Sequence, residues 1–344
     1  LPHCRIVTLL NTLNWHIVTL LFMKKEDLRI VYMGTPDFAV EGLRCLVEGG
    51  YNVVGVITMP DKPAGRGHKI QFSPVKQFAL DHNLPLLQPE KLKDESFVQA
   101  LREWKADLQI VVAFRMLPEV VWNMPRLGTF NLHASLLPQY RGAAPINWAV
   151  INGDTETGIT TFFLKHEIDT GEVIQQVRVP IADTDNVEVV HDKLMMLGGR
   201  LVIETVDAIL AGTVKPIPQE EMAVVGELRP APKIFKETCR IDWNQPVKRI
   251  YDFIRGLSPY PAAWTELINP SGEPVVVKIF ESEKRFETHQ LLPGTIVTDG
   301  KKSLKVAVTD GFIGILALQF PGKKRLRTEE LLRGYKITGD MRMK

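Results

Sequence analysis

The first part of the chain alternates short, apolar, β-branched runs with stretches of helical periodicity. Strand-like runs occupy 28–33, 51–58, 84–87 and 108–114. Apolar positions at helical spacing lie between them, over 38–47, 73–82 and 94–104. An alternation of strand and helix predicts a parallel sheet with helices on both faces, the arrangement of a Rossmann-like α/β domain.

The pattern continues with two strands and one long helix. Strands are expected over 157–164 and 173–180, joined by a turn at Asp169-Thr170-Gly171. The helix is expected over 186–210, with Asp185 as its N-cap and Gly212 just past its end.

The last third of the chain has a different pattern. Two Pro-rich stretches, 214–218 and 229–232, have the composition of an extended linker. One helix follows at 247–256, and then short strands at 263–268, 275–280, 294–298, 304–308 and 314–318. Short, evenly spaced strands predict a small OB-like β-barrel. We therefore expect a catalytic domain over 24–213, a linker over 214–232 and a barrel domain over 233–344.

The segment 1–22 fits neither a membrane span nor a signal peptide. It is apolar, but Asn11, Asn14 and His16 interrupt it, and no small-residue cleavage site follows. Met23 then leads directly into the first strand. We interpret residues 1–23 as an over-extended leader outside the fold, with translation starting at Met23, and expect no association with a membrane. N-terminal sequencing of native protein would test this.

Charge and cysteine content indicate the cellular compartment of the protein but say little about its function. A net charge of +2 is too small to indicate a nucleic-acid partner, so any basic surface must be local. Cys4, Cys45 and Cys239 lie far apart, with no CxxC pair. This spacing predicts free thiols in a reducing cytoplasm, without a zinc site or a disulfide framework.

Three polar residues carry the candidate chemistry. Asn131 and His133 follow a strand-like segment, and residues two apart in an extended chain share one face. A turn could bring Asp169 to the imidazole. An amide for a developing oxyanion, an imidazole for the proton and a carboxylate to fix that imidazole suit acyl transfer to an amine. The turn at 34–37 lacks GxGxxG, so no dinucleotide site is predicted.

The string Asn-Leu-His-Ala-Ser-Leu-Leu-Pro at 131–138, with Arg-Gly-Ala-Ala-Pro at 141–145 and Asp-Thr-Gly at 169–171, resembles the signature of the 10-formyltetrahydrofolate-dependent formyltransferases. Four further segments support the resemblance: 34–38, 61–69, 74–76 and 320–324. Together the motifs extend over about 28–337, which excludes the leader.

The resemblance implies a role for each matching residue. Asn131, His133 and Asp169 match the family's catalytic trio. The segment that matches the folate-binding motif consists of Ser135, Leu136, Leu137 and Pro138. By this resemblance the donor is 10-formyltetrahydrofolate, and the acceptor is the α-amino group of methionine on initiator tRNA. A monomer with neither a metal nor a covalent enzyme intermediate is expected.

Two basic segments are candidates for binding the tRNA. The first contains Lys62, Arg66, His68 and Lys69 in a Gly/Pro-rich stretch that we expect to form neither helix nor strand. The second contains Lys323, Lys324 and Arg325 on the predicted barrel. Such runs are usually only solvated surface. The family resemblance favours contacts with the acceptor end and the backbone of tRNA.

Two alternative functions remain. A sister enzyme would formylate glycinamide ribonucleotide or a UDP-linked amino sugar. The former group lacks this kind of barrel, and the latter commonly carries a charged residue where Ala143 stands. A protein of another class would bind RNA without catalysis, but the intact Asn131, His133 and Asp169 argue against it.

Overall fold

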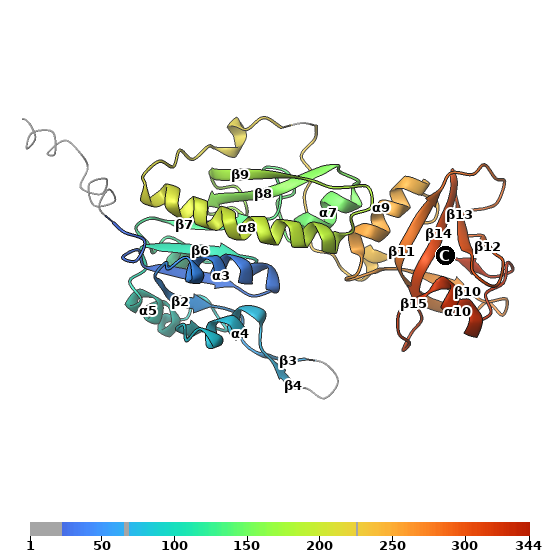
Figure 1. Ribbon diagram of the computed structural model, residues 1–344, viewed down its shortest axis with the longest axis horizontal. Helices are drawn as coiled ribbons and strands as arrows, with labels where there is room; N and C mark the ends of the chain where they lie inside the picture. Colours follow the sequence, from blue (N-terminus) through green and yellow to red (C-terminus); the bar gives the residue numbers. More distant parts are fainter. Residues whose placement is uncertain (1–22, 65–68, 225) are drawn as a thin grey trace, which may run out of the picture. The chain divides into compact units, whose positions relative to one another are not determined.

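The structure is a computed structural model that describes residues 23–64, 69–224 and 226–344 (Figure 1). The predicted leader, apart from Met23, lies outside the described residues, as do Arg66 and His68. The chain forms two compact units. Among the described residues, the first unit contains those up to Gln139 and those within Gly158–Arg178 and Asp192–Leu228. The second unit contains Tyr140–Thr157, Val179–His191 and Arg229–Lys344.

A sheet of seven strands forms the centre of the first unit, in the order β5-β2-β1-β6-β7-β8-β9. The pairs from β5 to β7 are parallel, as predicted, whereas β8 runs antiparallel to β7. The strands are β1 (Ile30–Gly34), β2 (Val53–Ile57), β5 (Leu86–Leu87), β6 (Leu108–Val112), β7 (Thr129–His133), β8 (Glu156–Phe163) and β9 (Val173–Pro180).

Helices cover both faces of this sheet, because the strands are apolar on both sides. On one face, α3 (Val40–Glu48) packs closely on α8 (Val187–Leu210) through Gly42 and Gly199 (Figure 1). On the other face, α5 (Glu95–Glu103) packs its apolar side against Val31 of β1. The other helices near this sheet are η1 (Asp37–Ala39), α4 (Pro74–Asp81) and α6 (Glu119–Trp122). The predicted Rossmann-like α/β class is confirmed.

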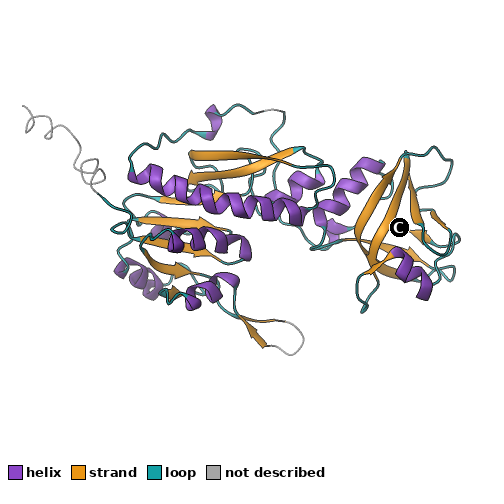
Figure 2. Ribbon diagram, viewed as in Figure 1, coloured by secondary structure: helices purple, strands orange, loops and turns teal. Residues whose placement is uncertain are grey.

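Two details of the prediction were wrong. The side chain of Asn186, not of Asp185, caps α8, since its Oδ1 accepts from Val189 N at 3.0 Å. The Asp185 carboxylate instead accepts from Ala182 N at 2.8 Å. The basic segment also forms strands, because β3 (Lys62–Ala64) pairs antiparallel with β4 (Lys69–Gln71) (Figure 2). Both strands of such a ribbon are edges, so proline is tolerated there.

An antiparallel barrel dominates the second unit (Figure 2). Its strand order is β12-β13-β14-β11-β10-β16, with β15 beside β14, and a bridge between Thr295 and Arg342 nearly closes it. The predicted small barrel is therefore confirmed. The strands are β10 (Ala263–Ile268), β11 (Pro274–Arg285), β12 (Ile296–Thr298), β13 (Leu304–Val308), β14 (Gly311–Gln319), β15 (Leu326–Arg327) and β16 (Arg342–Met343). Its helical elements are α7 (Pro145–Ile151), η3 (Glu237–Cys239), α9 (Val247–Leu257) and α10 (Thr328–Gly334).

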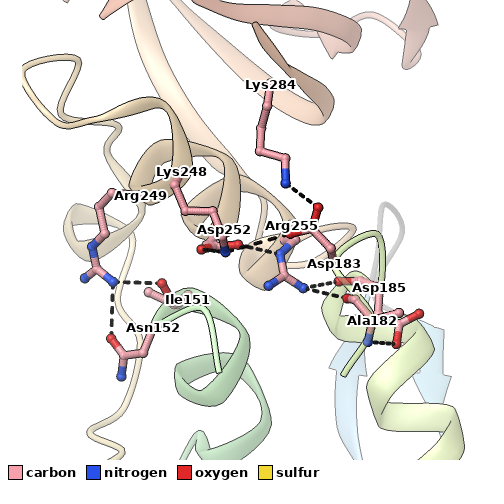
Figure 3. A network of polar contacts seen from close by, with 10 residues as sticks. All are labelled: Ile151, Asn152, Ala182, Asp183, Asp185, Lys248, Arg249, Asp252, Arg255 and Lys284. Carbon is pink, nitrogen blue, oxygen red and sulfur yellow. Dashed lines mark hydrogen bonds and ion pairs between the residues drawn. The ribbon is translucent and has the colours of Figure 1, made fainter. Parts of the chain in front are cut away.

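A buried ion pair on α9 ties several segments of the second unit together (Figure 3). Asp252 accepts from Arg255 Nε at 2.8 Å, and their side chains are 4% and 7% exposed. Arg255 also donates to the carbonyl of Asp185 at 2.7 Å, and Lys248 donates to Asp252 at 2.5 Å. A buried charge pair that also bonds to the backbone of neighbouring segments holds these segments in one arrangement.

Replacing Asp252 with Ala should lower the free energy of unfolding by about 3–5 kcal/mol, because Arg255 would remain buried without its counter-charge. Urea denaturation at neutral pH measures the change. The control is Glu287→Ala, which removes an exposed pair with Lys305 and should cost less than about 1 kcal/mol. Equal losses from both variants would contradict a special role for the buried pair.

Candidate active site

Strand β7 places Asn131 and His133 on one face of the sheet. In the antiparallel register, Asn131 lies opposite Phe162 and His133 lies opposite Thr160. Directly opposed residues share a face, so these four side chains point the same way. The ring of Phe162 meets the imidazole edge-on, with centroids 6.4 Å apart. The predicted geometry for the Asn131 and His133 pair therefore matches the strand that the structure contains.

Asp169 lies on the turn between β8 and β9 and faces the imidazole. Its Oδ2 is 3.8 Å from Nδ1 of His133, and the two side chains are 11% and 7% exposed. That distance is longer than a direct hydrogen bond, and the carboxylate would attract the imidazole as an ion pair only while the imidazole carries a second proton. The structure thus brings the three predicted catalytic residues into one unit, with the carboxylate beside the imidazole.

The turn that carries Asp169 has an unusual backbone. Asp169 has a φ of 55°, in the left-handed region, which Asp tolerates better than most residues. A Cβ on Gly171 would lie only 1.6 Å from the carbonyl oxygen of Phe163, so this position requires glycine. Phe163 N also donates to the carbonyl of Glu172 at 3.0 Å. The turn is therefore packed tightly against the end of β8.

Gln219 fastens the same turn from a distant part of the sequence. It lies in η2 (Gln219–Glu221), and its Nε2 donates to the carbonyls of Asp169 and Gly171, both at 2.8 Å. Gln219 lies within the expected linker at 214–232, and its contact with the turn was not predicted.

Side chains of β8 and β9 hold the segment that matches the folate motif by hydrogen bonds to its backbone. Thr160 Oγ1 donates to the carbonyl of Ser135 at 2.7 Å and accepts from Leu137 N at 3.2 Å. Gln176 Nε2 donates to the Leu137 carbonyl at 3.0 Å. The hydroxyl of Ser135 is itself used, since it donates to the Gln139 carbonyl at 2.6 Å. The sequence predicted neither Thr160 nor Gln176 as a support of this segment.

Within the described residues, the Oδ1 atom of Asn131 is buried and has no hydrogen-bond partner. A buried polar atom without a partner is costly, by about 1–3 kcal/mol, and is rare in folded proteins. Such an atom beside His133 suits a site that completes its hydrogen bonds when a polar ligand arrives. The residues present therefore fit the predicted chemistry at a polar acyl group and an amine.

The base of the β3–β4 hairpin is fixed by an ion pair. Lys76 donates to Asp61 at 2.5 Å, and Gln88 donates to the same carboxylate at 2.9 Å. The hydrogen bond from Lys76 holds the pKa of Asp61 below its ordinary value. Lys62 and Lys69 lie on the paired strands, while Arg66 and His68, between them, lie outside the described residues.

The basic residues of the barrel differ in what they contact. Arg325 pairs with Glu281 and stacks over the ring of Phe280, 4.8 Å from its centroid. Lys323 and Lys324 are exposed, and no ion pair involves either lysine among the residues that the structure describes. These two lysines are therefore better placed than Arg325 to meet an anionic partner.

The described part of the chain contains no helix that is both long and apolar enough to span a membrane. Within the same ranges, no three His, Cys, Asp or Glu residues gather in a way that could hold a metal ion. The prediction of a metal-free enzyme stays a prediction.

Family comparisons agree with the two-part architecture. The formyl transferase family model matches residues 28–206, and the model of the formyl transferase C-terminal domain matches residues 233–336. The chain belongs to the formyl transferase family. The predicted resemblance is thereby confirmed, and with it the expectation that the chain is an enzyme.

Curated relatives with high sequence identity to this chain all carry the name of one formyltransferase. Methionyl-tRNA formyltransferase of Bacteroides fragilis is 86% identical over 322 residues, which cover 94% of this chain and 99% of the relative. The protein of the same name from Bacteroides thetaiotaomicron is 85% identical, over 93% of this chain and all of the relative. That of Porphyromonas gingivalis is 51% identical, over 93% and 99%.

Solved structures share the fold at much lower identity. The sugar 3N-formyl transferase WlaRD is 19% identical with a TM-score of 0.58, and the match covers 86% of this chain and 99% of that one. HypX from Aquifex aeolicus, solved in complex with tetrahydrofolic acid, is 21% identical with a TM-score of 0.58, covering 88% of this chain and 46% of HypX. At this identity the likeness concerns the fold alone.

Replacing Gly171 with Ala should lower the free energy of unfolding by about 1–3 kcal/mol, because the new methyl group would overlap the Phe163 carbonyl. Urea denaturation gives the change in stability. Gly334→Ala is the matched control, since a Cβ there meets nothing within 4 Å. If Gly171→Ala were as stable as the control, the turn would be less tightly packed than described.

Proposed function

We propose that the chain transfers the formyl group of 10-formyltetrahydrofolate to the α-amino group of methionine on initiator tRNA. The observation that carries the proposal is the 86% identity to methionyl-tRNA formyltransferase over nearly the whole of that relative. The tetrahydrofolate named in the HypX structure supports a folate donor. The grouping of Asn131, His133 and Asp169 supports the chemistry.

His133 would handle the proton that the attacking amine loses. An imidazole can accept and release a proton near neutral pH, and such general acid–base catalysis contributes about 10²–10⁴-fold. Asp169, 3.8 Å away, would stabilise the imidazolium while that proton is held. A water could bridge the two groups, because the separation is too long for a direct hydrogen bond.

Asn131 would stabilise the negative charge that develops on the formyl oxygen. Its carboxamide offers donors on one side and an acceptor on the other, and the acceptor Oδ1 has no partner within the described residues. That free acceptor suits an N–H of the incoming amine. A hydrogen-bond donor placed at a developing oxyanion lowers the activation barrier by about 3–4 kcal/mol.

The folate supplies an activated formyl group on N10. Ser135, Leu136, Leu137 and Pro138 would position it, mainly through the backbone that Thr160 and Gln176 hold. Ser135 and Leu137 are buried, whereas Leu136 keeps part of its surface exposed. Leu136 is therefore the side chain of this segment best placed to touch the pterin or its linker.

The tRNA would bind through the β3–β4 hairpin and the barrel. We propose that residues 24–213 carry the chemistry, that 214–232 join the two parts and that 233–344 bind tRNA. Lys62, Arg66, His68 and Lys69 would meet the acceptor end, and Lys323 and Lys324 the backbone, with Arg325 contributing less because Glu281 already pairs with it. We further propose a cytoplasmic monomer that needs no metal.

Replacing His133 with Ala should lower kcat for formylation of methionyl-tRNA by about 10²–10⁴-fold, through loss of the proton acceptor. The KM for tRNA should change by less than about threefold, since the imidazole contributes little to binding energy. His82→Ala, at an exposed position directly after α4, is the control and should leave kcat unchanged. Substantial activity in His133→Ala would exclude the assigned role.

Replacing Lys323 and Lys324 together with Ala should weaken tRNA binding and reduce the slope of log K against log salt by up to about 2. The matched control is Lys301→Ala with Lys302→Ala, another pair of exposed lysines on the barrel. Filter binding over a range of salt concentrations compares the two. Equal slopes for both double variants would argue against a local tRNA surface at 323–324.

A further inference from the structure

We infer that Gln219 is a positioning residue for formyl transfer: its side-chain amide holds the turn that aims the Asp169 carboxylate at His133. The inference rests on the proposed role of Asp169. It assigns a catalytic consequence to a residue outside the sequence motifs, in a segment whose composition indicates only a linker.

The contacts of Gln219 use both hydrogens of its amide. A carboxamide nitrogen carries two donors, and here one points to the Asp169 carbonyl and the other to the Gly171 carbonyl, both at 2.8 Å. The residue is 2% exposed, so water does not compete for these bonds. Two bonds from one rigid, planar group fix the orientation of the Asp169–Thr170 and Gly171–Glu172 peptide units.

The segment that carries Gln219 is itself anchored beside the turn. The amide N–H of Ile217 donates to the Val173 carbonyl, and the Ile217 carbonyl accepts from Val173 N, both at 2.9 Å. Val173 is the first residue of β9, four residues after Asp169. Gln219 therefore reaches the turn from a support attached to the sheet.

The turn needs such a support because its backbone is held in a sparsely populated conformation. Asp169 has a φ of 55°, and this conformation persists only where surrounding contacts impose it. Rotation of the peptide units next to Asp169 would swing the carboxylate away from Nδ1 of His133, now 3.8 Å distant. A shift of about 1 Å in a catalytic group can cost 10²-fold in rate.

Gln219→Leu removes both donors at nearly constant volume, and Gln219→Glu keeps the length but replaces the donating nitrogen with an oxygen. Each should lower kcat about 10–100-fold. The KM values for folate and tRNA should change by less than about threefold, because neither substrate is expected to touch Gln219. Gln99→Leu, on the exposed face of α5, is the surface control and should match wild type.

The decisive experiment combines Gln219→Leu with Asp169→Asn. If Gln219 acts through Asp169, its replacement should change kcat by less than about threefold once the carboxylate is gone. A merely structural role would lower kcat by the same factor in both backgrounds. Single-turnover formylation measures the slow variants, and thermal unfolding of each shows whether it folds. Gln219→Glu takes the place of Gln219→Leu if the latter does not fold.

The outcomes separate the two claims. An Asp169→Asn variant with wild-type kcat would contradict the proposed role of Asp169. It would also overturn the inference that Gln219 acts by positioning Asp169. If Asp169→Asn loses activity while Gln219→Leu and Gln219→Glu keep wild-type kcat, only the inference on Gln219 is overturned. Multiplying losses in the double variant, or a KM change that accounts for the whole effect, would overturn it as well.

Discussion

The antiparallel pairing of β8 with β7 is the constraint on which the site depends. The sheet is parallel as far as β7, and the next strand in that order, β8, runs the other way. This pairing sets Phe162 opposite Asn131 and Thr160 opposite His133. One register thus places the two candidate catalytic side chains and also supplies the Thr160 hydroxyl that holds the turn at Ser135–Leu137.

Backbone groups, held by buried amides and hydroxyls, carry most of the remaining geometry. Thr160 and Gln176 fasten the turn at Ser135–Leu137, and Gln219 fastens the turn at Asp169. Each of these bonds joins segments far apart in the sequence. Turns fixed in this way need little rearrangement as charge develops, which is the condition under which a polar site stabilises a transition state well.

Much of the fold could be predicted from the sequence, because strand and helix periodicities are local properties. The same is true of Asn131 and His133, since alternation along an extended strand puts residues two apart on one face. The turn at Asp169 was also predictable, because Gly171 marked it. The cap of α8 was not, since Asp185 and Asn186 are adjacent and both suit an N-cap.

What could not be predicted involves contacts between distant segments. Thr160, Gln176 and Gln219 bond to backbone groups, and no spacing rule indicates which carbonyl a buried amide will meet. The β3–β4 hairpin was not predicted, because a Gly- and Pro-rich composition is not typical of strands. The structure nevertheless pairs Lys62–Ala64 with Lys69–Gln71. In both cases the missing information is tertiary.

The most direct test of the account compares three acceptors with 10-formyltetrahydrofolate as donor: methionyl initiator tRNA, glycinamide ribonucleotide and a nucleotide-linked amino sugar. We expect kcat/KM for methionyl-tRNA to exceed that of the other two by several orders of magnitude. This activity should disappear in His133→Ala. Faster formylation of either small acceptor, or no formylation of methionyl-tRNA by folded protein, would contradict the proposed function.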